Sequence, residues 1–369
     1  MKSKDSWLKK IEYYLKNKID KLVFKEMKSI LIIKPEEKLS LFDGSKILIL
    51  RNDRIGDLLV SVPFIKTLRN RYPNVEIDIL LSVKNYSAKR AIEHLVNNIF
   101  VYRKKILNTL LLIYQLRTKK YDIIIDLFDN PTTTNSLIIK LAKPLYSIGL
   151  HKRKTNSYSI EVPLLNKLKN HIVDRINQLL MPFGIDPKNA ESKLLYELKE
   201  QELNAANDLL GLKTKTYRLG INISGSSMSK FWGWDNYKEF IELIIKLHSN
   251  YEIIIFESGP NPGEAESLIL NSICRIAPPT EDFNIYAAML STCDIILSPD
   301  TAAVHLAACF QIPCVGLYLF SGTKETGVPW TPYNSPSKCI KTKTNDLKNI
   351  VVEDVVNALD ELITEHSIY

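Results

Sequence analysis

Short apolar runs alternate with stretches of helical periodicity along most of this chain. Each run has the length of a strand, and the residues after it are apolar at every third or fourth position. Apolar runs without internal alternation predict strands buried on both faces, as in a parallel sheet covered by helices. The predicted strands lie at residues 47–50, 75–81, 123–126 and 146–149 in the first half, and at 217–223, 252–256, 294–297 and 313–318 in the second.

Helices are predicted between these strands. They cover residues 171–183, 235–248, 262–270 and 351–363, and a further helix starts at Asp300. Strands that alternate with helices predict α/β units with parallel sheets. We therefore expect two Rossmann-like domains at 46–190 and 217–345, a polar linker at 191–216 and a C-terminal helix within 346–369.

Residues 1–45 differ from the rest of the chain. Apolar residues from Trp7 to Leu22 recur at helical spacing among many lysines, which predicts a basic amphipathic helix. Such a helix either packs on the first domain or lies on a membrane surface with its lysines toward anionic lipid.

Charge and cysteine content limit the function classes. The 369 residues carry a formal charge of +8, which suits an acidic partner such as a phosphate, a nucleotide or an anionic membrane. Aromatic residues are not interleaved with Lys and Arg, so no nucleic-acid partner is expected. Five cysteines without a C-x-x-C pair favour a reducing cytoplasm over a disulfide framework. We expect neither a transmembrane segment nor a signal peptide.

Open parallel sheets bind ligands outside the carboxyl ends of their strands, so loops from strand to helix are the candidate sites. One such loop runs from Ser298 to His305. Asp300 is expected to cap the helix, whose unpaired first-turn N–H groups and positive dipole end would attract a phosphate. Thr301 and His305 are four residues apart and share one face. The alternative is an ordinary capped helix with a surface histidine.

A second candidate loop covers residues 224–232. It is rich in serine and contains Gly225 and Lys230, so backbone N–H groups, hydroxyls and an ammonium could surround an anion. The Walker spacing is absent, and an ordinary polar loop is an equal alternative.

The third candidate loop is Arg54-Ile55-Gly56-Asp57, after the first strand. Gly56 permits a close approach of the backbone. The carboxylate of Asp57 is either a helix cap or a general base at a cleft between the domains, and its position alone favours the cap.

Together the three loops resemble glycosyltransferase family 9, the bacterial lipopolysaccharide heptosyltransferases. The resemblance runs in order through residues 47–63 with the Gly56-Asp57 pair, 121–127, 171–180, 230–232, and 300–308 with Pro313. It implies an α/β fold of the GT-B type, in which two Rossmann-like domains face a cleft. It also implies an inverting, metal-independent glycosyltransferase without a cofactor, which moves a sugar from a nucleotide-sugar donor. The expected reaction carries heptose from ADP-heptose to a lipopolysaccharide core or a related cell-surface glycan.

The resemblance assigns roles to single residues. Asp57 would take the proton of the acceptor hydroxyl, and Lys230 would neutralise charge on the departing diphosphate. The donor would be bound by Ser226, Glu264, Asp300, Thr301, Ala302 and His305. The acceptor side would contain Arg54, Gly56, Arg90 and Arg153, whose charges suit an anionic glycolipid or oligosaccharide.

The chain departs from the family pattern in three places. Ala302 stands where the family usually has glycine, and Phe128-Asp129 stands where it often has Gln-Gly. The basic extension at 1–45 is also unusual, and it would bring the enzyme to an acceptor lipid at the inner leaflet. These differences affect the identity of the two sugars more than the reaction class.

Other function classes remain open. The donor could be a UDP-sugar, or the chain could be a GT-B nucleotide-sugar epimerase or a non-catalytic nucleotide-sugar-binding protein. An epimerase needs acids and a base around a bound UDP-sugar, and we find no such motif set. The presence of both Asp57 and Lys230 argues against a non-catalytic protein. The sequence makes no prediction of the oligomeric state.

Overall fold

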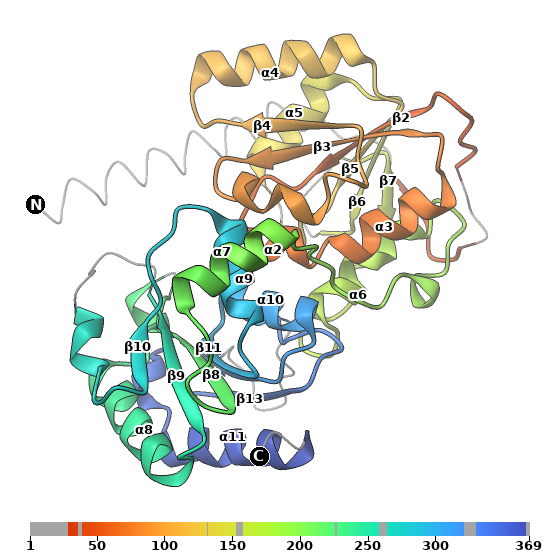
Figure 1. Cartoon of the computed structure of the whole chain (residues 1–369). Coiled ribbons are helices and arrows are strands. Elements are labelled where there is room, and N and C mark those ends of the chain that lie inside the picture. Colours follow the sequence, from red (N-terminus) through yellow and green to blue (C-terminus); the bar gives the residue numbers. More distant parts are fainter. Residues whose placement is uncertain are drawn as a thin grey trace, which may run out of the picture.

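Two parallel sheets, one in each half of the chain, form the framework of the molecule (Figure 1). The structure is a computed structural model that describes residues 29–35, 39–130, 132–152, 158–225, 227–257, 264–320 and 330–366. Every predicted strand lies within one of the two sheets, so the α/β fold class is confirmed. The predicted N-terminal helix, with its apolar residues from Trp7 to Leu22, lies outside the described residues.

The first sheet has the order β1-β7-β6-β5-β2-β3-β4, and all its pairs are parallel. Its strands are β1 (Ile30–Leu31), β2 (Lys46–Leu50), β3 (Glu76–Ser82), β4 (Asn98–Tyr102), β5 (Ile123–Asp126), β6 (Tyr146–Leu150) and β7 (Ile160–Val162). The helices of this half are α2 (Ile55–Leu59), α3 (Val62–Arg71), α4 (Ile106–Lys119), α5 (Thr133–Ala142) and α6 (Ile172–Asn177). Residues 47–50 are fully buried, as expected for a central strand covered on both faces.

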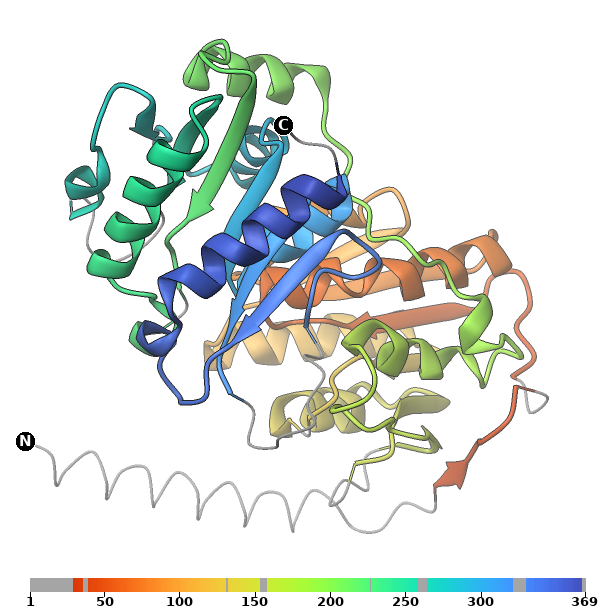
Figure 2. The same cartoon turned by 90° about the horizontal axis from the view of Figure 1, so that it is seen from below.

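The second sheet has the order β10-β9-β8-β11-β12-β13, and it is also parallel throughout. Its strands are β8 (Tyr217–Asn222), β9 (Tyr251–Phe256), β10 (Cys274–Ile276), β11 (Ile295–Pro299), β12 (Cys314–Tyr318) and β13 (Ser337–Lys341). Its helices are α7 (Glu200–Leu210), α8 (Trp234–Leu247), α9 (Phe283–Ser291), α10 (Ala302–Phe310) and α11 (Val352–Glu365). Figure 2 shows α11 lying across the second sheet, where it contacts β12, β13 and α8.

Three predicted helices differ from the structure. The helix expected at 171–183 ends at Asn177 and continues as a 3₁₀ turn to Leu180. The helix expected at 262–270 is a 3₁₀ segment over Glu264–Leu268, and residues 258–263 lie outside the described part. The helix expected to start at Asp300 starts at Ala302, because Thr301 provides the cap.

The two halves share one hydrophobic core. A single cluster of buried side chains extends from the α2 and α3 layer of the first half to α9 and α10 of the second. Hydrogen bonds also join the halves: Tyr333 donates to the Asp174 carboxylate at 2.8 Å, and the His171 ring lies 2.9 Å from the Thr331 carbonyl oxygen. These contacts hold the carboxyl edge of the first sheet against that of the second.

Candidate functional site

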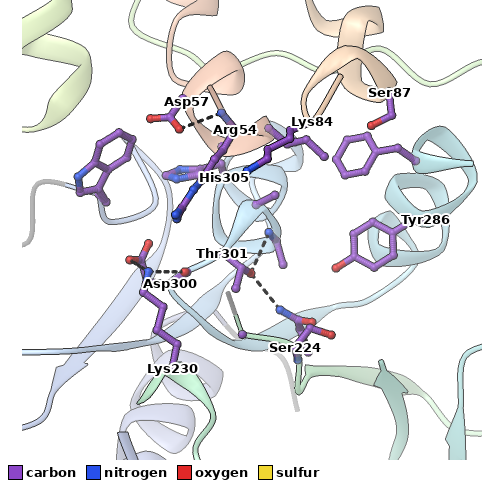
Figure 3. Close-up of a pocket in the computed structure, with 18 of the residues that line it drawn as sticks. Arg54, Asp57, Lys84, Ser87, Ser224, Lys230, Tyr286, Asp300, Thr301 and His305 are labelled. Atoms are coloured by element: carbon purple, nitrogen blue, oxygen red, sulfur yellow. Dashed lines mark hydrogen bonds and ion pairs between the residues drawn. The ribbon is translucent and has the colours of Figure 1, made fainter. Parts of the chain in front are cut away.

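A cavity of about 810 Å³ lies between the two halves, at the carboxyl ends of their strands (Figure 3). The first half contributes the loops after β2 and β3, and the second half contributes the loops after β8, β10, β11 and β12. The lining residues are Arg54, Ile55, Gly56, Asp57, Lys84, Ser87, Asn222, Ser224, Gly225, Lys230, Thr280, Glu281, Phe283, Tyr286, Asp300, Thr301, Ala302, Ala303, His305 and Trp330. All three candidate loops of the sequence therefore meet at one cavity.

Asp57 lies in the first turn of α2, at the upper wall of the cavity in Figure 3. Its carboxylate accepts a hydrogen bond from the Arg54 backbone N–H at 3.3 Å, and its Oδ1 lies 3.6 Å from Nη2 of the buried Arg51. Burial raises the pKa of this carboxyl, and the Arg51 guanidinium opposes the rise. Asp57 therefore caps the start of the helix, as its position predicted. Its raised pKa also makes the carboxylate a stronger base.

Asp53 is a second carboxylate on the same guanidinium. Its Oδ2 lies 3.2 Å from Nη1 of Arg51, and among the described residues its Oδ1 is buried without a hydrogen-bond partner. Burial raises the pKa of Asp53 to about 7; Arg51 opposes this rise, and the charge of Asp57 adds to it. At neutral pH the single positive charge of Arg51 does not balance the two negative charges of Asp53 and Asp57.

Lys230 and Asp300 form an ion pair on the opposite wall. The Lys230 ammonium donates to the Asp300 carboxylate at 2.6 Å and to the Asp300 carbonyl oxygen at 3.1 Å. The prediction that Asp300 caps the helix is wrong. Thr301 caps it instead: its hydroxyl oxygen accepts from the Ala303 N–H at 3.3 Å and from the Asn222 amide at 3.0 Å. The Asp300 carboxylate is therefore available to the lysine.

The first turn of α10 faces the cavity through Ala302 and Ala303. First-turn N–H groups have no intrahelical partner and lie at the positive end of the helix dipole. With the Lys230 ammonium beside them, they offer a place for a diphosphate. The Ala302 methyl occupies this end of the cavity, where the resembling family usually has glycine.

His305 is buried, so the alternative of a surface histidine is wrong. A Cβ atom added to Gly56 would lie 2.9 Å from Cδ2 of His305, which means that α2 and α10 meet at this pair. Burial, with smaller contributions from His171 and Lys230, lowers the His305 pKa to about 3, so the ring is neutral. Among the described residues, its Nδ1 has no hydrogen-bond partner. Trp330 packs edge-on against the ring at 6.1 Å between centroids.

Only some of the other predicted site residues line the cavity. Arg54 and Gly56 line the cavity. Arg90 is not among the lining residues; its guanidinium makes two hydrogen bonds to the Glu202 carboxylate of α7, at 2.8 and 3.3 Å. Ser226, Arg153 and the Glu264 side chain lie outside the described residues, so their roles stay predictions.

Sequence reasoning missed part of the lining. Lys84 and Ser87 follow β3, a strand that was predicted although the loop after it was not named as a candidate site. Thr280, Glu281 and Tyr286 follow β10, a strand of three residues that is too short for an apolar run to reveal. Because ligands bind beyond the carboxyl ends of strands in such sheets, the loop after β3 could have been predicted as part of the site.

The described residues contain no group of three or more His, Cys, Asp or Glu side chains that could hold a metal ion. None of their helices is both long and apolar enough to cross a membrane. All five cysteines are free thiols.

The chain is similar to known proteins over most of its length. Residues 110–359 match the model of glycosyltransferase family 9 (heptosyltransferase). Lipopolysaccharide heptosyltransferase 3 of Escherichia coli is 25% identical over 299 residues, which is 76% of this chain and 84% of that protein. A family 9 glycosyltransferase of Veillonella parvula has the same fold, with a TM-score of 0.72, 18% identity and coverage of 88% of this chain and 98% of that one. E. coli heptosyltransferase WaaC, solved with ADP, superposes with a TM-score of 0.66 at 17% identity, covering 87% and 98%.

Proposed function

This chain belongs to glycosyltransferase family 9 and is a glycosyltransferase of the heptosyltransferase type, and we propose that it moves heptose from ADP-heptose to an anionic glycolipid such as a lipopolysaccharide core. The observation that carries the proposal is the division of the cavity. Asp57 faces it from the first half, and the Lys230–Asp300 pair with the start of α10 faces it from the second.

The second half is proposed as the donor side. A nucleoside diphosphate needs compensating positive charge, and the Lys230 ammonium and the first turn of α10 provide it side by side. In this proposal the ammonium moves from the Asp300 carboxylate to the donor's phosphates, while Asp300 turns to hydroxyls of the sugar. Support for an adenosine donor comes from heptosyltransferase WaaC, which was solved with ADP.

The first half is proposed as the acceptor side, with Asp57 as the general base. The acceptor oxygen attacks the anomeric carbon and its proton passes to the Asp57 carboxylate. The bond from that carbon to the diphosphate oxygen breaks, and the diphosphate leaves with the electron pair. Attack from the side opposite the leaving group inverts the anomeric centre. Lys230 and the α10 N–H groups stabilise the charge that develops on the leaving group, a role that requires no metal ion.

The proposed domain division follows these roles. Residues 46–190 would bind the acceptor and 217–345 the donor, with 191–216 between them, 346–369 as a C-terminal helical segment and 1–45 as the basic extension. We place the enzyme in the cytoplasm, at the inner face of the cytoplasmic membrane, where an acceptor lipid would be met. Arg54, which lines the cavity beside Asp57, would contact acidic groups of the acceptor.

The test is release of ADP from ADP-heptose, measured with and without lipopolysaccharide core acceptor. We expect release that depends on the acceptor and falls about 10²–10⁴-fold in Asp57→Asn, the usual contribution of a general base. Asp43→Asn, at an exposed carboxylate outside the cavity lining, is the matched control and should act as wild type. Nucleotide release that does not depend on the acceptor, conversion of the donor to a stereoisomer without nucleotide release, or full activity of Asp57→Asn would reject the proposal.

A further inference from the structure

The outer face of α4 is covered with exposed apolar side chains. Ile106 is 81% exposed, Leu107 74%, Leu110 57%, Leu111 64% and Tyr114 68%. Spacings of three, four and seven residues place them on one side of the helix. We call these five residues the α4 stripe. Helices on the surface of a soluble domain normally present polar residues there, and a contiguous apolar surface indicates an interaction site.

The α4 stripe is separate from the face that holds the helix in the fold. Leu112, Ile113 and Leu116 are buried on the inner side, and Leu112 and Leu116 join a core cluster with residues of β2, β3, β5 and α5. Figure 1 shows α4 as part of the outermost layer of the first half, with α5 beside it. The stripe therefore adds nothing to the packing of this domain, and its exposure requires another explanation.

The charged residues of α4 and of the segments that flank it in the chain are all basic. Residues 103–120 contain no Asp or Glu, and neither does the neighbouring helix α5. Arg103, Lys104 and Lys105 are exposed before the helix, and Arg117 and Lys120 are exposed near its end. An apolar helix face bordered by cations is the pattern that enters the headgroup region of a bilayer with anionic lipids.

We propose that the α4 stripe docks on an anionic lipid bilayer, with Leu and Ile side chains among the acyl chains and the flanking cations at the phosphates. A second copy of this chain would bring the same cations together, and the lysine-rich N-terminal segment would do so as well. Only an anionic surface complements both the apolar face and its border. Docking is interfacial, because α4 is a helix of 14 residues, or about 21 Å.

The position of the helix relates docking to the site. α4 starts just after the carboxyl end of β4, and Tyr102 at that end is in register with Ser82 of β3. Two residues beyond Ser82, Lys84 lines the cavity. Docking through α4 thus brings the first-half side of the cavity toward the lipid surface.

The test is co-sedimentation of the full chain with vesicles of phosphatidylcholine alone or mixed with phosphatidylglycerol, without donor or acceptor. We expect binding to the anionic vesicles that falls about tenfold in the Leu107→Glu/Leu111→Glu variant. Leu212→Glu/Leu247→Glu changes two exposed leucines of the second half by the same charge and should bind as wild type. Leu111→Trp should be quenched by brominated acyl chains well beyond the wild-type level, and Leu212→Trp should not.

Three outcomes would overturn the proposal. The stripe variant could bind vesicles as well as its control. Leu111→Trp could stay unquenched on bound protein, which would place the contact elsewhere, such as in residues 1–28. Light scattering could also show a wild-type dimer that the stripe variant converts to a monomer, which would assign the stripe to a second copy. The measurement needs no enzymatic turnover, so its failure and a failure of the proposed reaction are distinguishable.

Discussion

The contact between Gly56 and His305 predicts a strong effect of a single methyl group. In Gly56→Ala the new Cβ would lie 2.9 Å from the His305 ring, whereas carbon atoms in favourable contact are ~3.5 Å or more apart. His305 is 2% exposed and packs against Trp330, so its ring has little room to move. Overpacking of this kind costs ~1–3 kcal/mol of folding free energy. The alternative is a shift of α2 away from α10.

Either response separates the proposed base from the proposed donor site. A displacement of about 1 Å in a positioned group can cost ~10²-fold in rate, so we expect kcat to fall by about one to two orders of magnitude. Stability is measured by denaturant unfolding and kcat by ADP release. Wild-type values for Gly56→Ala in both assays would refute the argument.

A double-mutant cycle isolates the contact from other effects. His305→Ala removes the ring that the methyl would meet, at the cost of its own packing. Gly56→Ala/His305→Ala should therefore be more stable than the sum of the single effects predicts, by ~1–2 kcal/mol. Strictly additive effects would show that the two residues do not interact.

Three further predictions concern charge. Lys230→Ala should weaken donor binding and lower kcat by ~10²-fold or more, whereas Lys230→Arg should keep part of both, measured by ADP-heptose titration and turnover. Asp53 has a pKa near 7, above its unfolded value of 3.8, so its protonation stabilises the fold below pH 4 and this stabilisation is lost as the pH rises through 7. The Tm of Asp53→Asn relative to wild type should therefore increase between pH 5 and pH 8, and parallel pH curves would contradict this. Because the Asp129 charge raises the pKa of Asp57, the acidic limb of kcat/KM should move to lower pH in Asp129→Asn; an unmoved limb would remove Asp57 as the titrating base.

The sequence by itself determined the fold class and the loops that line the candidate site. Uninterrupted apolar runs such as residues 47–50 and 123–125 are local signals of buried parallel strands, because side chains on both faces of a covered sheet are mostly apolar. Loops after such strands are then candidate sites by topology alone, and the ones that contain Asp57, Lys230 and Asp300 all line the cavity.

Several strands of the structure were not predicted from the sequence. β1, β4, β7, β10 and β13 were not predicted. β1, β7 and β10 have only two or three residues, and three of the five residues of β13 are polar. The apolar residues 99–102 of β4 were not recognised as a strand. The loop after β10 was missed with its strand, and Thr280 and Glu281 of the cavity were missed with that loop.

Tertiary structure decided what each polar side chain does, because partners distant in the chain compete for it. Asp300 looked like a cap, but Thr301 takes that place and Lys230, 70 residues away, takes the carboxylate. Arg90 looked like an acceptor residue, but its nearest carboxylate is that of Glu202. His305 is neutral because the fold buries it, with Gly56 from the other half of the chain close to its ring. Periodicity reports burial on one element, whereas pKa values and ion pairs depend on which elements the fold brings together.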